Sequence, residues 1–128
     1  MIVLDTSVII AYLDGEDEHH ERAEHLFANE IDDDFGANSL TLAEVFVAPT
    51  RANRLDEART ALRDLEVEEL ALPSDTAVKL AKLQAATGLK MPDCCVLLAA
   101  EHIHGRVATF DDRLARAAGT RNLETVDH

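Results

Sequence analysis

The chain opens on an apolar run interrupted by one acid and two hydroxyl residues: Met1-Ile2-Val3-Leu4-Asp5-Thr6-Ser7-Val8-Ile9-Ile10-Ala11-Tyr12-Leu13. Residues 2–4 are predicted to form a short buried strand, because strands covered on both faces of a parallel sheet have continuous apolar runs. Thr6 or Ser7 can then cap a helix that begins at about Val8. Asp5 would lie where a central strand ends and a helix begins, which is where open α/β sheets place their ligands. No basic residue stands close to Asp5 in sequence, so its charge needs a partner from elsewhere in the chain.

The composition is that of one small globular domain, residues 1–128, with 47% hydrophobic residues. No apolar run approaches the roughly 18 residues of a membrane-spanning helix, and no secretory signal pattern opens the chain. The two cysteines, Cys94 and Cys95, are adjacent on a predicted helix, where neighbouring side chains have poor geometry for a disulfide. We therefore expect a cytoplasmic protein without membrane contacts, in which both cysteines are small core residues.

The formal net charge of −13 argues against a binder that holds nucleic acid through clustered lysines and arginines. The same charge is compatible with a basic protein partner or with bound divalent cations. The positions of the acids, rather than their sum, decide between these classes.

Predicted strands and helices alternate along the chain. The strands are expected at residues 2–4, 35–37, 67–72, 106–110 and 123–126. The helices are expected from about residue 8 and at 21–31, 40–48, 53–66, 76–87, 92–104 and 111–118, with Pro49 ending the third. This alternation predicts an α/β fold of three layers, in which helices cover both faces of a parallel sheet of five strands.

Three acids stand in apolar surroundings, unlike most of the 25 acids in the chain. Asp5 is the one charge in residues 1–13, Glu44 the one charge in residues 35–50, and Asp93 the one charge in residues 91–100. An ionised carboxylate is costly to bury without a partner. Each also has a purely structural interpretation: Asp5 as a helix cap, Asp93 as a favourable charge in a helix's first turn, and Glu44 on an exposed helix edge.

Asp111 makes a ligand site the better interpretation, because it follows the fourth predicted strand as Asp5 follows the first. If those strands are neighbours, the two aspartates flank one crevice, which Asp93 and Glu44 can enter from their helices. Four converging carboxylates repel one another and raise one another's pKa values. A hard divalent cation with oxygen ligands, Mg²⁺ or Mn²⁺, relieves that repulsion. The histidines and cysteines show no zinc-type spacing.

These features together resemble the PIN domain, specifically the VapC-type toxin ribonucleases of toxin–antitoxin pairs. The resemblance covers essentially the whole chain. It is carried by Ile2-Val3-Leu4-Asp5-Thr6-Ser7, Leu42-Ala43-Glu44-Val45, Met91-Pro92-Asp93-Cys94 with Ala99-Ala100, and Val107-Ala108-Thr109-Phe110-Asp111-Asp112-Arg113-Leu114.

The resemblance implies a five-stranded parallel sheet in the order 3-2-1-4-5 and an acidic site that holds Mg²⁺ or Mn²⁺ and hydrolyses RNA. Its catalytic and metal-binding residues would be Asp5, Glu44, Asp93 and Asp111. Polar residues that support the site would be Thr6, Ser7 and Thr109. Asp112 departs from the pattern, since that position is often basic or polar, and an extra acid there could support the site. The family also implies a homodimer and a basic antitoxin that inserts an arginine-containing segment into the acidic cleft.

Basic residues that could gather at the rim of the cleft are candidates for contacting RNA: Arg51, Arg54, Lys90, Arg113 and Arg116. The best candidates are Arg51, Lys90 and Arg113, because each lies close in sequence to a predicted site acid.

Two other classes stay open. One is a PIN fold without catalysis that acts as a binding module. The other is a phosphoacceptor resembling response regulators, which fits poorly because the third predicted strand ends at Leu72-Pro73 without an acid and no lysine follows Lys90.

Overall fold

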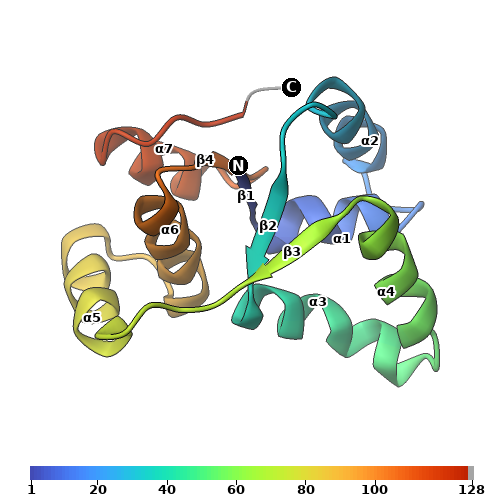
Figure 1. The fold of residues 1–128 in the computed structure, drawn as a ribbon, viewed down its shortest axis with the longest axis horizontal. Coiled ribbons are helices and arrows are strands. Elements are labelled where there is room, and N and C mark those ends of the chain that lie inside the picture. The colour runs from blue at the N-terminus through green and yellow to red at the C-terminus, as the bar shows by residue number, and fades with distance from the viewer. Residues whose placement is uncertain (127–128) are drawn as a thin grey trace.

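The computed structural model describes residues 1–126, which form a parallel sheet with helices on both faces (Figure 1). The strands are β1 (Ile2–Leu4), β2 (Phe35–Asn38), β3 (Val67–Leu70) and β4 (Arg106–Ala108). Their order is β3-β2-β1-β4, and every pair is parallel. The predicted α/β fold is confirmed, with β1 in the interior of the sheet.

The helices divide into two groups that cover opposite faces of the sheet (Figure 1). On one face lie α1 (Thr6–Leu13), α2 (His20–Asn29), α3 (Ser39–Arg51) and α4 (Leu55–Asp64). On the other lie α5 (Thr76–Thr87), α6 (Met91–Ile103) and α7 (Asp112–Thr120).

The side chains of β1 explain why its sequence is continuously apolar. Ile2 and Leu4 pack into the core beneath α1 to α4, and Val3 packs into the core beneath α5 to α7. All three are 0% exposed. Successive strand residues point to opposite faces, so a strand covered on both sides needs an apolar residue at every position.

The predicted fifth strand at residues 123–126 is wrong: there the chain makes a single bridge between Val107 and Thr125. The reason lies in β4. The Arg106 N–H donates to Met1 O at 3.0 Å, and the Ala108 carbonyl accepts from Asp5 N at 2.9 Å. Both groups therefore face the β1 side of β4. Only Val107 has its N–H and carbonyl on the outer edge, where they pair with Glu124 O and Val126 N at 2.9 Å. Only one residue of this three-residue strand can therefore pair with a fifth strand. Within residues 1–126 the sheet has the order β3-β2-β1-β4.

Two predicted helix ends also differ. Pro49 does not end α3, which continues to Arg51. A proline in the last turn removes one backbone hydrogen bond, and here the Thr50 hydroxyl donates to Phe46 O while Pro49 O accepts from Arg54 N. At the other end of the chain, α1 begins at Thr6 rather than Val8, with Asp5 as its N-cap residue.

Cys94 and Cys95 are buried in α6 as free thiols, as the sequence predicts. Among residues 1–126, no helix is long and apolar enough to cross a membrane.

Gly105, between α6 and β4, lies against the backbone of the first residue. A Cβ at Gly105 would come within 2.8 Å of Met1 O, a backbone atom that β4 holds through Arg106 N. Gly105→Ala should therefore lower the free energy of unfolding by about 1–3 kcal/mol, the usual cost of overpacking.

Gly119 in α7 is the matched control, because a Cβ there meets no heavy atom within 4 Å. Gly119→Ala should leave the stability unchanged or raise it by up to about 1 kcal/mol, since alanine favours helix. Urea unfolding of both variants measures the difference. Equal stability of the two variants would contradict the close contact at Gly105.

Candidate functional site

Four predicted acids come from four elements that meet at the carboxyl edge of the sheet. Asp5 directly follows β1, and Asp111 follows β4, the neighbour of β1. Asp93 lies in the first turn of α6, and Glu44 lies in the second turn of α3, a helix that contacts α6. Residues spread along the chain from position 5 to position 111 thus share one edge of the fold.

Asp5 is the buried member of this acid cluster (Asp5, Glu44, Asp93 and Asp111), with 6% of its surface exposed. Its Oδ2 accepts hydrogen bonds from Ser7 Oγ at 2.8 Å and from Thr109 Oγ1 at 2.7 Å. Within residues 1–126, Oδ1 accepts no hydrogen bond. Two hydroxyl donors therefore compensate for burial of the charge on one oxygen, and the other oxygen stays available to a ligand.

The same hydroxyls hold the loop between β4 and α7. Ser7 Oγ accepts from Phe110 N at 3.0 Å, and Thr109 Oγ1 accepts from Asp111 N at 3.0 Å. Each hydroxyl donates to Asp5 and accepts from a backbone amide, so the carboxylate and the loop that carries Asp111 are fixed together.

Asp111, rather than Asp5, is the acid whose side chain caps a helix. Its Oδ1 accepts from Arg113 N at 2.8 Å and from Leu114 N at 3.3 Å, the pattern of an N-cap on α7. The side chain of Asp5 makes no such bond to α1. The capping interpretation available for Asp5 in the sequence therefore does not account for it.

The pKa of Asp93 shows that the four acids lie within electrostatic reach. Burial raises that pKa most, and the negative charges of Asp5, Asp111 and Glu44 raise it further, while the Lys90 ammonium opposes them. The arrangement costs stability when every carboxylate is ionised.

Repulsion among the four carboxylates is consistent with their open, partly exposed arrangement. Glu44 and Asp111 are exposed, Asp93 is half-buried, and no three Asp, Glu, His or Cys side chains in the described part of the chain are arranged as a ready ligand set for a metal ion. The donors at this edge are oxygen atoms of carboxylates and hydroxyls, the type that Mg²⁺ and Mn²⁺ prefer. The chemistry of the donor set therefore fits a hard divalent cation.

The remaining predicted residues lie at different distances from the cluster. Thr6 is the half-buried first residue of α1, and Asp112 is exposed in the first turn of α7. Lys90 precedes α6 and acts on Asp93, and the backbone of Arg113 binds Asp111. Arg51 lies in the last turn of α3, about two helical turns beyond Glu44.

Asn38 is a helix cap that also carries a buried amide donor without a partner in residues 1–126. Asn38 is 0% exposed, and its Oδ1 accepts from Thr41 N at 2.9 Å, which fixes the orientation of the amide. Its Nδ2 has no hydrogen-bond partner in residues 1–126. Continuing the register of β1 and β2 by two residues sets Asn38 beside Asp5. A buried donor beside an acid gives no signal in sequence, because only the unused Nδ2 distinguishes it from an ordinary cap.

Replacing Asp93 by asparagine should stabilise the metal-free protein at neutral pH. A raised pKa means that the folded chain holds the Asp93 proton more tightly than the unfolded chain does. Stability then falls as the pH rises through the interval between the unfolded and the folded pKa, and the loss is complete above the folded pKa. In EDTA, Asp93→Asn should have a higher free energy of unfolding than the unsubstituted chain at pH 7, and the gain should shrink as the solution is made acidic.

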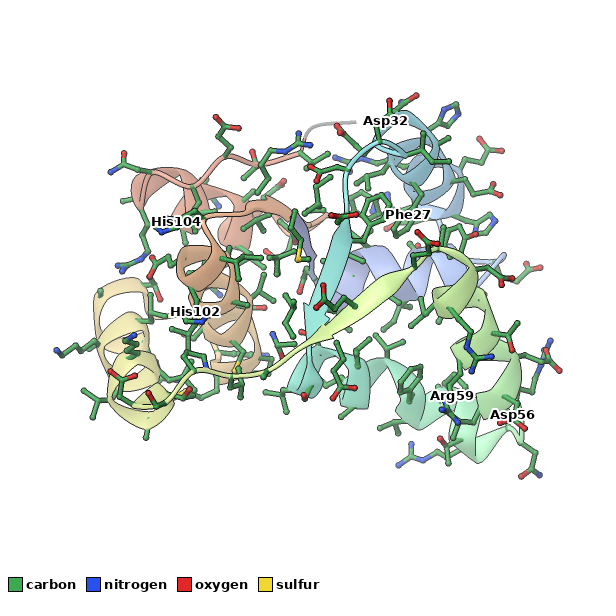
Figure 2. All side chains as sticks on the ribbon, in the orientation of Figure 1. Phe27, Asp32, Asp56, Arg59, His102 and His104 are labelled. Atoms are coloured by element: carbon green, nitrogen blue, oxygen red, sulfur yellow. The ribbon has the colours of Figure 1, made fainter. Side chains whose placement is uncertain are left out.

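Asp56→Asn is the matched control, since Asp56 also lies in the first turn of a helix, the exposed α4 (Figure 2). Both substitutions lose the same helix-dipole interaction, so their difference reports the burial of Asp93 together with the repulsion from its acidic neighbours. A pH-independent difference between the two variants in urea unfolding would contradict electrostatic strain at Asp93.

The comparisons with known proteins agree with the fold. The family model of the PIN domain matches residues 2–120. No curated protein sequence gives a significant match. A toxin–antitoxin complex from Klebsiella pneumoniae is 20% identical, with a TM-score of 0.75 and coverage of 99% of this chain and 97% of that chain.

Two further solved structures show the same likeness of fold. VapC20 of Mycobacterium tuberculosis, a sarcin–ricin loop cleaving toxin, is 16% identical with a TM-score of 0.76, covering 91% of this chain and 95% of that chain. FitAcB from Neisseria gonorrhoeae is 19% identical with a TM-score of 0.73, covering 99% and 97%. The family model spans nearly the whole chain, and on that match the chain belongs to the PIN domain family.

Proposed function

We propose that this PIN domain is a divalent-metal-dependent endoribonuclease and the toxin of a toxin–antitoxin pair. The observation that carries the proposal is the acid cluster at the carboxyl edge of the sheet, with Asp5 oriented by two hydroxyls and Asp93 strained by its acidic neighbours. A structural role explains Asp111 as a cap, but it explains neither the burial of Asp5 nor the approach of four like charges.

The residues that would hold Mg²⁺ or Mn²⁺ are Asp5, Glu44, Asp93 and Asp111. When bound, such a cation lowers the pKa of a water molecule and stabilises the charge that develops on a phosphodiester in hydrolysis. Ser7 and Thr109 hold the Asp5 carboxylate in one orientation, because both donate to Oδ2. By analogy with the family, the products would carry a 5′-phosphate and a 3′-hydroxyl.

RNA is the proposed substrate, in line with the similar fold of VapC20, a sarcin–ricin loop cleaving toxin. Lys90 and Arg113, which flank the acid cluster, and Arg51 on α3 are the proposed RNA contacts. The net charge of −13 makes non-specific binding weak. Selectivity would then come from the shape of the RNA or from single-stranded bases.

The chain should cleave structured or unstructured RNA with Mg²⁺ or Mn²⁺ and should not cleave it in EDTA. Asp5→Asn and Asp93→Asn should each slow cleavage by about a hundredfold or more, because the metal supplies several kcal/mol of transition-state stabilisation. Gel analysis of end-labelled RNA measures the rates. Cleavage that survives EDTA or either substitution would refute the metal mechanism.

Asp56→Asn, on the exposed surface of α4, is the control and should cleave at the unsubstituted rate. Thermal unfolding gives a second readout that needs no activity. Mn²⁺ should raise the unfolding midpoint of the unsubstituted chain and of Asp56→Asn more than that of Asp93→Asn, because a ligand stabilises only a protein that binds it.

A basic antitoxin is the proposed partner, and a groove beside the acid cluster supports this. The groove has a volume of about 550 Å³ and lies between α1, α3 and α4, and Glu44 of the acid cluster is one of its lining residues. Its walls are mostly apolar: Ile10, Leu13, Val45, Ala48, Pro49, Ala52, Ala58 and Ala61. An apolar segment lying in the groove could set an arginine against the carboxylates, where an arginine–carboxylate pair is strong.

Co-expression with the product of an adjacent small reading frame tests this partner. A basic product should co-purify with the chain and suppress cleavage. Ala48→Glu, which adds a charge to the wall of the groove, should weaken that complex by about tenfold or more, and Ala77→Glu on the exposed surface of α5 should not. Equal effects of the two substitutions would remove the groove from the proposal.

The homodimer stays a prediction that rests on the family resemblance, and the cytoplasmic location stays a prediction that rests on the sequence. The second candidate function is a PIN fold that binds RNA or a partner without catalysis. The open arrangement of the carboxylates, with no ready ligand set in residues 1–126, favours it. The cleavage experiment separates the two, since a binding module would cleave no RNA.

A further inference from the structure

A second pocket lies between the end of α5, the start of α6 and α7, and arginines dominate its polar lining. Its volume is about 610 Å³. The residues that matter are Thr87, Leu89, Arg113, Arg116, Thr120 and Arg121, and no carboxylate lines it. We call it the arginine pocket.

The concentration of positive charge in this pocket opposes the charge of the whole chain. The chain has 12 lysines and arginines against 25 acids, yet three arginines line one cavity. Arg121 is paired with Glu101, which fixes its position. Within residues 1–126, Arg113 and Arg116 make no ion pair, so their charges are available to a ligand.

The spacing of the two unpaired arginines suits an extended anion. Arg113 and Arg116 are three residues apart on α7, so they lie on the same face of the helix. A guanidinium presents a planar fork of donors that matches two phosphate oxygens. The Thr87 and Thr120 hydroxyls donate to helix carbonyls, to Leu83 O and Arg116 O, which leaves the arginines as the principal donors.

Two connections place the arginine pocket next to the acid cluster. Arg113 N donates to Asp111 Oδ1 at 2.8 Å, so the helix that carries the arginines starts at an acid of the cluster. Leu89, on the pocket wall, precedes Asp93 by four residues, and Lys90 between them acts on the Asp93 carboxyl. A chain that lies across the acids can therefore continue into the pocket.

We propose that the arginine pocket binds backbone phosphates of the RNA next to the phosphate that lies at the acid cluster. The proposal rests on the proposed ribonuclease function and adds where the bound strand would lie and where it would continue beyond the acid cluster. Along the strand, one phosphate would lie at the carboxylates and neighbouring phosphates would lie against Arg113 and Arg116. The pocket has no aromatic side chain on which a base could stack, so phosphate contacts would position the strand without reading its sequence.

Binding of a short labelled single-stranded RNA, followed by fluorescence anisotropy, tests the pocket separately from cleavage. Ca²⁺ replaces Mg²⁺ to neutralise the carboxylates, and a gel verifies that the RNA stays intact. The double variant Arg113→Ala/Arg116→Ala should bind about tenfold more weakly or worse, because hydrogen bonds to charged groups are lost. The slope of log K against log salt should become shallower by about 1.4, the value for two phosphate contacts on a single strand.

Arg59→Ala/Arg63→Ala is the matched control, since it removes the same charge from the exposed face of α4, away from α5 and α7 (Figure 2). The control should bind RNA with nearly the unsubstituted affinity and slope. Circular dichroism should show both variants folded, because alanine favours helix at all four positions.

Equal weakening in the two double variants would overturn the proposal, because the effect would then follow the net charge alone. Unchanged affinity of Arg113→Ala/Arg116→Ala would overturn it as well, even if the unsubstituted protein cleaves RNA. Conversely, pocket-dependent RNA binding by a chain that cleaves no RNA would support the pocket and refute the ribonuclease function.

Discussion

The Asp5 carboxylate is held between two hydroxyls that come from opposite ends of the chain, Ser7 on α1 and Thr109 beyond β4. An ionised group this deeply buried needs such donors, because the loss of its hydration costs several kcal/mol. The hydroxyls also accept from Phe110 N and Asp111 N, so they join β1 to the loop after β4. The orientation of Asp5 and the position of the loop that leads into α7 therefore depend on the same four hydrogen bonds.

Asp93 shows what this edge of the sheet costs when no cation is present. Its burial and its three acidic neighbours favour the protonated form, and only Lys90 acts in the opposite direction. A protein selected for stability alone would have a neutral residue there. The proposed cation site would account for this cost, because the repulsion that destabilises the metal-free cluster is the interaction that a divalent ion would remove.

Much of this site could be predicted from sequence, because a single charge within an apolar run is a strong signal. Asp5, Glu44 and Asp93 stand out for that reason, and the repeated strand-then-acid pattern added Asp111. Strand number could not be predicted. Residues 123–126 have strand-like side chains, but the bonding capacity of β4 is set by which of its three residues face outward. The end of α3 was also missed, since Pro49 lies where a helix is already ending and the lost hydrogen bond matters little.

The arginine pocket could be seen only in three dimensions, although two of its residues, Arg113 and Arg116, were candidate RNA contacts from the sequence. Arg121 follows the end of α7, whereas Thr87 and Leu89 precede α6 in the sequence. No short stretch of the sequence therefore contains the whole pocket. Under the proposed function, its place beside the carboxylates would reconcile the net charge of −13 with a polyanionic substrate. Screening limits electrostatic interactions to about 8–10 Å in physiological salt, so acids far from the pocket would act only weakly on a phosphate near Arg113 and Arg116, and the proposed cation would offset the carboxylates nearby. The acidic surface elsewhere would then disfavour other positions of the RNA, and the strand would lie where the carboxylates can reach it.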